Sequence, residues 1–472
     1  MKEYYTYFSD QYANLASKRT KGHVLFEGID WIISVEDFTN GVEYLKGLIE
    51  NLTKPNDIIS FEFDESSTHL IPICFWAALV SNRVYLPIIH EAPNERKNEL
   101  KKISKAHFLC TKGVVETSIS NQCRYSSENN AYILTTSGST GRPKLVPISY
   151  HNLFSYSKSV FKEIQITKES VLYTNINYHF DVIIPSLISP ILTGCTSIIL
   201  RPQESILAEK SSNLFLKSNI VIQVPTWADL FFAKLRIDKL FARDTEQQVK
   251  TFIFCGEQLN PSTVKNLRQS IGSCEVYNAY GPSEATVWVT AYKVEKEIGE
   301  IVSIGVPHKG TDFIILNESL TECDLGMLYI SGDQLFEGYL GSEKNPFIKY
   351  QNKKFYRTGD ICKVDNCGRY YILGREDEQI KRKGYRIELA EIDSFYKKHL
   401  EGVKTIFCEG KIITYYTGCQ VAEKNLIRMG LNSLNHYSIP DVFVNIDHLP
   451  TLDNGKIDRQ ALIKLHRDNY NE

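Results

Sequence analysis

A ten-residue stretch rich in glycine and hydroxyl side chains, TTSGSTGRPK at 135–144, constrains this chain more than any other feature. It follows an apolar run at 132–134 and precedes a helix-like segment that begins near Tyr150. Its glycines let backbone amides approach an anion, while hydroxyl groups and a lysine add donors and positive charge. The composition predicts a phosphate-binding loop. Its candidate contacts are Thr136, Ser137, Gly138, Ser139, Thr140, Gly141 and Lys144.

Two other glycine motifs do not describe this loop. A Walker loop needs GxxxxGK followed by serine or threonine, whereas Lys144 follows a proline and precedes a leucine. A GxSxG elbow needs a residue between glycine and serine, and here Ser139 follows Gly138 directly. On composition alone, a flexible surface turn is the competing interpretation. The motifs that follow along the chain decide between the two.

Alternating helical and β-rich segments predict an α/β fold. Apolar residues repeat at helical spacing over 42–52, and residues 58–63 alternate like a strand. Short β-rich runs at 196–200, 219–224 and 251–254 are separated by segments long enough for crossover helices. We therefore expect parallel sheets covered by helices.

The length of 472 residues predicts more than one hydrophobic core. Within 374–393 a glycine- and charge-rich segment changes into an amphipathic pattern led by Ile387, Leu389 and Ile392. We place a hinge there. The expected domains are a large one at 1–374 and a small mobile α+β lobe at 375–472.

Charge, hydropathy and cysteine content exclude several classes. Lys plus Arg total 54 against 56 Asp plus Glu, so no basic field favours nucleic acid. The first residues lack the apolar core of a secretory signal, and the longest apolar stretch, 71–80, is shorter than the roughly 20 residues of a membrane span. Eleven cysteines without a CxxC pair indicate free thiols, and a metal or redox role for Cys362 and Cys367 is the weaker alternative. A soluble, cytoplasmic protein is expected.

The loop closely resembles the signature of the adenylate-forming superfamily, which includes acyl-CoA synthetases, firefly luciferase and the adenylation domains of nonribosomal peptide synthetases. Further motifs of that family follow in order. They are NAYGPSEATVWVT at 278–290, YRTGD at 356–360, ILGRED at 372–377 and LPTLDNGKIDR at 449–459. Each alone is explained by a turn, a loop or a solvated lysine. The ordered set makes chance an implausible explanation, and it implies the adenylate-forming enzyme fold.

The resemblance also implies roles for individual residues. The loop handles the β and γ phosphates of ATP, Tyr280 stacks on adenine, Ser283 touches the α-phosphate and Glu284 holds Mg²⁺. Asp360 and Arg375 contact the ribose. The other implied ATP contacts are Asn278, Ala279, Gly281, Pro282 and Ile372. The implied catalytic residues are Lys456, on the C-terminal lobe, with Glu284 and Lys144.

The implied chemistry joins two anions, so fixed positive charge matters more than proton transfer. A carboxylate attacks the α-phosphorus of ATP and pyrophosphate leaves. A pantetheine thiol then displaces AMP. In the family the small lobe rotates between the two steps about the residue matched by Asp377, and a thiol channel passes the segment around Gly384.

Asp181, in NYHFDVIIPSL, matches the aspartate that binds the substrate's α-amino group in amino-acid-activating members. The alternative is a helix N-cap. The usual FDxS pattern reads FDVI here. By positional match the pocket is formed by Val182, Pro185, Thr226, Ile253, Cys255, Ala279, Val287 and Trp288, with Lys456 also reaching the substrate. This mostly apolar wall favours a small uncharged amino acid.

Within the superfamily, D-alanine:D-alanyl carrier protein ligases are the closest likeness, through TFIFCGEQL, YGPSEATVWVT and residues 374–393. Trp288 departs from the small residue expected there, so a ligase for proline or another small amino acid is close behind. The alternatives are a small-acid acyl-CoA synthetase and a non-catalytic nucleotide-binding protein. Asp181 argues against the first, and the presence of Lys456 and Glu284 against the second.

The acceptor is expected to be a carrier protein in trans, because only 16 residues follow Lys456. Carrier domains are usually acidic. A basic cluster of Lys381, Arg382, Lys383 and Arg386 is a candidate docking surface, and a solvated basic face is the competing interpretation.

Overall fold

The structure of the chain is a computed structural model. It describes residues 2–18, 22–104, 106, 108–111, 114–117, 129–136, 143–201, 209–235, 251–341, 345–376, 379–382, 385–451 and 457–470. Within these ranges no helix is both long enough and apolar enough to cross a membrane.

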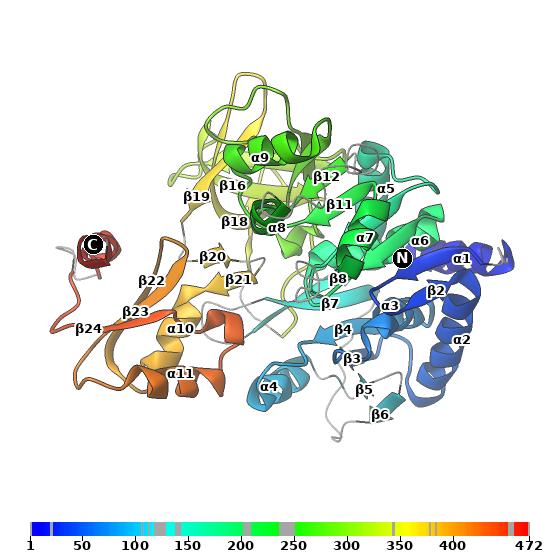
Figure 1. The fold of residues 1–472 in the computed structure, drawn as a ribbon, viewed down its shortest axis with the longest axis horizontal. Coiled ribbons are helices and arrows are strands. Elements are labelled where there is room, and N and C mark those ends of the chain that lie inside the picture. The colour runs from blue at the N-terminus through cyan, green and yellow to red at the C-terminus, as the bar shows by residue number, and fades with distance from the viewer. Residues whose placement is uncertain are drawn as a thin grey trace. The chain divides into compact units, whose positions relative to one another are not determined.

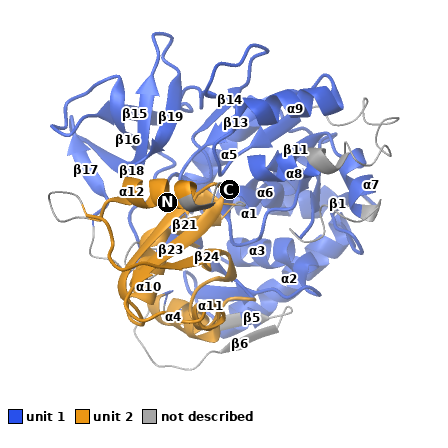
Figure 2. Cartoon of the chain, turned by 60° about the vertical axis from the view of Figure 1, so that its left-hand side comes forward, with its two compact units in different colours: residues 1–90, 104–134, 145–376 blue, residues 91–103, 135–144, 377–472 orange. Residues whose placement is uncertain are grey.

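The chain forms two compact units, coloured separately in Figure 2. Unit 1 comprises residues 1–90, 104–134 and 145–376. Unit 2 comprises residues 91–103, 135–144 and 377–472. Two short segments from the first third of the sequence thus group with the C-terminal residues. The predicted boundary between 374 and 375 stays a prediction.

Unit 1 contains an eight-stranded sheet with the order β14-β13-β12-β11-β9-β10-β1-β2 among the described residues. Its strands are β1 (Val24–Glu27), β2 (Ile32–Ser34), β9 (Val171–Thr174), β10 (Thr196–Ile199), β11 (Ile220–Gln223), β12 (Thr251–Phe254), β13 (Glu275–Tyr280) and β14 (Thr290–Lys293). The pairs from β1 to β13 through β10, β9, β11 and β12 are parallel, and only the edge strands β2 and β14 run antiparallel. The prediction of parallel strands at 196–200, 219–224 and 251–254 is confirmed.

A second sheet, which lies in unit 1 except for residues 135, 136 and 144, has the order β6-β5-β3-β4-β7-β8. Its strands are β3 (Ile58–Glu62), β4 (Val84–Ile88), β5 (Phe108–Thr111), β6 (Val114–Thr117), β7 (Asn130–Thr136) and β8 (Lys144–Ser149). The glycine-rich stretch therefore connects β7 and β8, and the helix expected near Tyr150 begins directly after β8. Ser149 caps that helix, α5 (Tyr150–Ile164), by a reciprocal pair of hydrogen bonds with Asn152.

Helices pack against both sheets (Figure 1). They are α1 (Lys2–Lys18), α2 (Val35–Leu52), η1 (Thr68–Leu70), α3 (Ile71–Val80), η2 (Asp181–Ile183), α6 (Ile184–Thr193), α7 (Glu209–Lys217), α8 (Pro225–Leu235) and α9 (Pro261–Ile271). The apolar stretch at 71–80 is α3, which is buried nearly all round and packs on β4. The indole Nε1 of Trp76 donates to the Leu187 carbonyl in α6, 2.8 Å away, and α6 packs on β9 and β10. This contact ties the helices of the two sheets into one core.

A third sheet of unit 1, antiparallel in all its described pairs, carries the later motifs. Its strands are β15 (Thr311–Leu316), β16 (Leu325–Gly332), β17 (Phe347–Tyr350), β18 (Lys353–Val364) and β19 (Tyr370–Arg375). In the pairing of β18 with β19, Asp360 lies opposite Arg375. The strand register therefore brings two separate motif residues face to face.

Unit 2 has its own core, built around Ile387, Leu389, Ile392 and Tyr396. Its elements are α4 (Asn94–Ser104), β20 (Gln379–Arg382), β21 (Tyr385–Glu388), α10 (Leu389–Tyr396), β22 (Glu401–Cys408), β23 (Lys411–Thr417), α11 (Glu423–Leu431), η6 (His436–Ser438), β24 (Val442–Asn445) and α12 (Arg459–Tyr470). A buried ion pair joins α4 to α10, with Arg96 Nη1 2.5 Å from the Glu391 carboxylate. The contact explains why residues 91–103 group with the C-terminal elements.

Candidate active site

Three residues from separate motifs meet at the end of β13 in unit 1. The Tyr280 hydroxyl donates to Asp360 Oδ2 at 2.5 Å, and Arg375 Nη1 donates to Asp360 Oδ1 at 2.8 Å. Burial, and then the negative charge of Asp360, raise the pKa of Tyr280, so the phenol is a neutral donor. Asp360 is thereby fixed by one donor on each oxygen. A carboxylate held in this way can accept hydrogen bonds from a diol such as a ribose.

Other residues of the 278–290 and 372–377 motifs lie on the strands and the short helix around this group. Asn278 Nδ2 donates to the Ser303 carbonyl at 2.9 Å, and Ala279 is buried on β13. Pro282 precedes the short helix η5 (Ser283–Ala285), which begins at Ser283. Ile372 lies on β19 opposite Cys362.

Gly281 is required where it stands. A Cβ atom at this position would lie 2.4 Å from the Trp288 Cα and 2.8 Å from the Val287 carbonyl oxygen. No side chain fits at that separation. The two halves of the 278–290 motif therefore pass each other in direct backbone contact.

Glu284 is completely buried on η5, and its carboxylate is held by a residue that the sequence did not single out. The Tyr339 hydroxyl donates to Glu284 Oε1 at 2.7 Å, and the Tyr356 hydroxyl lies 3.3 Å from that of Tyr339. Tyr356 belongs to YRTGD and Tyr339 to FEGYLG, so two further segments converge on the proposed metal ligand. No pattern in the sequence around Tyr339 indicated this contact.

Asp181 is the first residue of η2 and is 9% exposed. The N-cap residues of η2 and α6 are Phe180 and Ile183, so Asp181 occupies neither N-cap position. The negative charge of Asp181 contributes, after burial, to raising the pKa of the Tyr132 and Tyr156 hydroxyls. The three groups therefore lie within electrostatic reach of one another.

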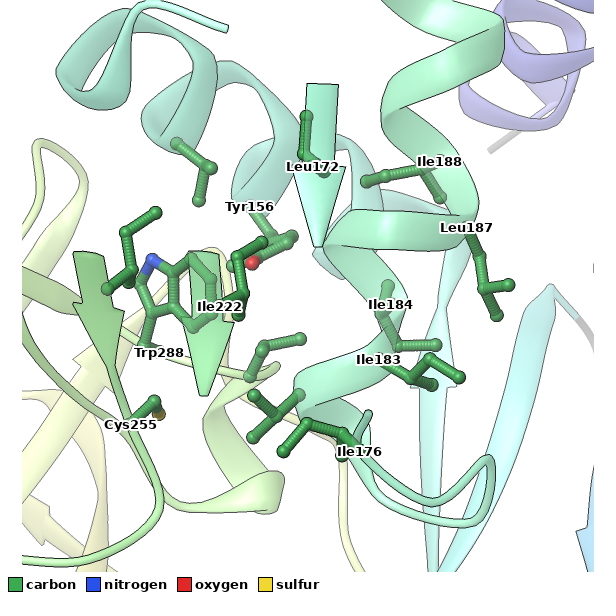
Figure 3. Packing of buried hydrophobic residues seen from close by; sticks show 14 of the residues in the cluster. Tyr156, Leu172, Ile176, Ile183, Ile184, Leu187, Ile188, Ile222, Cys255 and Trp288 are labelled. Carbon is green, nitrogen blue, oxygen red and sulfur yellow. The ribbon is translucent and has the colours of Figure 1, made fainter. Parts of the chain in front are cut away.

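The apolar residues assigned to the pocket are buried in the same core. Trp288 and Tyr156 are edge to face, with ring centroids 5.4 Å apart, and Figure 3 shows them beside Ile222 with Cys255 below. Val182, Pro185, Ile253, Ala279 and Val287 are buried as well. Thr226, at the start of α8, has polar contacts instead. Its backbone N–H and its hydroxyl both donate to Glu257. Its role is partly to anchor that helix.

The other predicted site residues belong to unit 2 or are not described. Thr136 ends β7 and Lys144 begins β8, both in unit 2. Ser137, Gly138, Ser139, Thr140 and Gly141, together with Lys456, Asp377 and Gly384, lie outside the described residues. Within the described ranges no group of three or more His, Cys, Asp or Glu side chains is arranged to hold a metal ion, and Cys362 and Cys367 are free thiols.

Comparison with known families gives a match to the AMP-binding enzyme family over residues 77–340, more than half of the chain. The chain belongs to the AMP-binding enzyme family. The resemblance stated for the motifs is thus confirmed, and the α/β fold with a large body and a smaller lobe is confirmed with it.

Two relatives illustrate the range of sequence similarity. The chain is 28% identical over 445 residues to D-alanine--D-alanyl carrier protein ligase of Bacillus licheniformis, covering 83% of this chain and 86% of that protein. It is also 28% identical over 450 residues to Surfactin synthase subunit 2 of Bacillus subtilis, but covers only 12% of that protein's length. The chain thus spans nearly all of one relative and a small part of the other.

Solved structures share the fold. The Vibrio cholerae adenylation domain AlmE, in complex with glycyl-adenosine-5'-phosphate, has a TM-score of 0.82 at 19% identity and covers 98% of both chains. PA1221, a nonribosomal peptide synthetase protein with adenylation and carrier domains, has a TM-score of 0.77 at 19% identity, over 97% of this chain and 84% of that one. The chain thus belongs to a family of adenylate-forming ligases and shares the fold of these adenylation domains.

Proposed function

We propose that this ligase activates a small uncharged amino acid and loads it onto a carrier protein in trans. The amino acid carboxylate attacks the α-phosphorus of ATP, the bond to the β-phosphate oxygen breaks, and aminoacyl-AMP and pyrophosphate are formed. The phosphopantetheine thiol of the carrier then loses its proton and attacks the acyl carbon, and AMP leaves. The products are an aminoacyl thioester and AMP.

The observation that carries this proposal is the buried carboxylate of Asp181. Its position matches the aspartate that binds the α-amino group in amino-acid-activating members, and an α-ammonium group offers a buried carboxylate both opposite charge and hydrogen-bond donors. Acetate and benzoate have no ammonium group and cannot make this interaction. For this reason we favour an amino acid over the substrates of acyl-CoA synthetases.

The size of the side chain follows from Trp288. This indole is fully buried against Tyr156, where a smaller residue was expected. Its volume takes space that a large substrate side chain would need. Glycine and alanine are therefore preferred over larger amino acids, and D-alanine stays one candidate among them.

The proposal for the second half-reaction is supported by similarity to relatives and not by contacts in the structure. Relatives of similar length act, by their names, on a D-alanyl carrier protein. We assign the hinge to Asp377, the thiol channel to Gly384 and the carrier-docking surface to the basic cluster around Lys381. Arg382 in that cluster pairs with Asp441 at 2.8 Å, so part of its charge is already neutralised.

Mg²⁺ fits the donor set around Glu284. A single buried carboxylate, completed by phosphate oxygens of ATP, is an arrangement this ion accepts. Glu284 would hold the ion, which supplies positive charge to the phosphates when bound. Tyr339 orients the Glu284 oxygen through its hydroxyl. This hydrogen bond leads to a specific expectation.

Tyr339→Phe is expected to weaken divalent-ion binding roughly tenfold, because it removes the hydroxyl that fixes the ligating carboxylate. Electron paramagnetic resonance of Mn²⁺ titrated into the protein with ATP measures this directly. Tyr150→Phe is the matched control, since its hydroxyl also donates to a buried carbonyl, that of Leu79 at 2.8 Å, away from Glu284. Equal Mn²⁺ affinity in both variants would rule out the orienting role of Tyr339.

Amino-acid-dependent exchange of labelled pyrophosphate into ATP tests the proposed function. The panel contains D-alanine, L-alanine, glycine and L-proline, with acetate and benzoate as acids that lack an ammonium group. Exchange is expected with one or more of the amino acids and not with the two acids. Activity confined to acetate or benzoate would transfer the chain to the acyl-CoA synthetase class.

A further inference from the structure

Residues 334–336 are bonded to the turn 284–288, which carries both the proposed metal ligand and the pocket residues. Gln334 Nε2 lies 3.3 Å from the Ala285 carbonyl oxygen, 3.3 Å from that of Thr286 and 2.9 Å from that of Trp288. The Thr286 hydroxyl donates back to the Gln334 carbonyl at 2.6 Å, and the Phe336 N–H donates to the Glu284 carbonyl at 2.8 Å. Five hydrogen bonds therefore link these two segments.

The turn needs such support because its backbone is unfavourable. Thr286 and Val287 have φ angles of 58° and 68°, a left-handed conformation that β-branched residues rarely adopt. Strain of this kind persists only where surrounding contacts enforce it. The carbonyls that this conformation exposes are those that Gln334 bonds.

The conformation of the turn determines where Trp288 lies. Its backbone lies against Gly281, and its ring lies edge to face with Tyr156 (Figure 3). Trp288 Nε1 and the Tyr156 hydroxyl are buried and have no hydrogen-bond partner among the described residues. No polar contact therefore fixes the indole directly, and its place depends on the backbone that Gln334 holds.

Gln334 is itself held from other elements. Three carbonyls face its Nε2, which fixes the amide orientation, and its Oε1 lies 3.4 Å from His308 Nδ1. Asn152 Nδ2, at the start of α5, donates to the Asp333 and Leu335 carbonyls at 2.8 and 3.0 Å. The residues on both sides of Gln334 are therefore tied to α5, and Gln334 is 3% exposed.

We infer that Gln334 is a positioning residue that holds the strained 284–288 turn, and that it thereby sets the selectivity for small substrates by keeping Trp288 in the pocket. Gln334 touches neither the substrate nor ATP in this role and acts through the backbone of the turn. The selectivity part of the inference rests on the proposed function. The positioning part rests on the contacts alone.

Fluorescence tests the positioning part without any activity. The contribution of Trp288 to acrylamide quenching is obtained as the difference between each variant and the same variant carrying Trp288→Phe. Gln334→Leu removes the donor at similar volume, and Thr286→Val removes the returning hydroxyl with little change in shape. Both are expected to raise the quenching constant of Trp288 several-fold, and Tyr150→Phe is expected to leave it unchanged. If Gln334→Leu does not fold, Thr286→Val still tests the inference. An unchanged quenching constant of Trp288 in Thr286→Val would overturn it.

Pyrophosphate exchange tests the selectivity part. The quantity measured is the ratio of kcat/KM for the preferred amino acid to kcat/KM for valine. Both variants are expected to lower this ratio about tenfold, whereas the KM for ATP changes less than about twofold. An unaltered ratio of glycine or alanine to valine would overturn the selectivity role. Failure of the proposed function looks different, because the wild type would then exchange no amino acid while the quenching results would stand.

Discussion

Replacing Lys456 by alanine is expected to reduce adenylate formation by about 10²–10³, because one fixed positive charge is lost where two anions must react. The carboxylate and the α-phosphate repel each other, and a lysine ammonium offsets that repulsion only if it is positioned in advance. Pyrophosphate exchange under saturating ATP measures the loss. Lys456 lies in LPTLDNGKIDR, outside the described residues, so this expectation rests on the motif.

The two half-reactions should respond differently to this change. Thiolysis does not require charge at the departing pyrophosphate, so Lys456→Ala supplied with synthetic aminoacyl-AMP should still load the carrier protein. Lys464→Ala, an exposed lysine on α12, is the matched control and should retain full exchange. Near-wild-type exchange by Lys456→Ala would refute the assigned role.

The site residues that could be assigned from the sequence are those that stand in short motifs of a known family. Tyr280, Asp360 and Arg375 were assigned to ATP from three short motifs, and the structure brings them into direct hydrogen-bond contact. Periodicity likewise indicated the parallel strands of the eight-stranded sheet. The roles of these residues at ATP were implied by the resemblance and stay predictions, whereas the periodicity of a strand is a local property of its sequence.

The parts that the sequence could not predict depend on distant partners. Tyr339 bonds a residue 55 positions away, and Gln334 bonds carbonyls 46 to 49 positions away. A tyrosine and a glutamine in an ordinary-looking segment carry no periodic or compositional signal of such contacts. Their contacts appear only in the structure, where the segment after β16 lies against the 278–290 motif.

The grouping of α4 has the same origin. Its position between two strands of the six-stranded sheet predicts that it belongs to the large domain. In the structure the buried pair of Arg96 with Glu391 joins residues 295 positions apart. A buried guanidinium and carboxylate are stable only as partners, so neither could be read as buried from its own surroundings in the sequence.

Asp181→Asn is expected to lower kcat/KM for the amino acid by about 10²–10³, because the substrate ammonium would enter a buried site without its counter-charge. The amide keeps the shape of the carboxylate, so packing against Val182 and the tyrosines should persist. The KM for ATP should stay near the wild-type value, which separates loss of substrate binding from loss of the fold. Asp312→Asn, at an exposed pair with Lys353, is the control and should change neither constant. If Asp181→Asn kept its activity toward amino acids, the ammonium would be bound elsewhere. The preference for amino acids over acids without an ammonium group would then lose its physical basis.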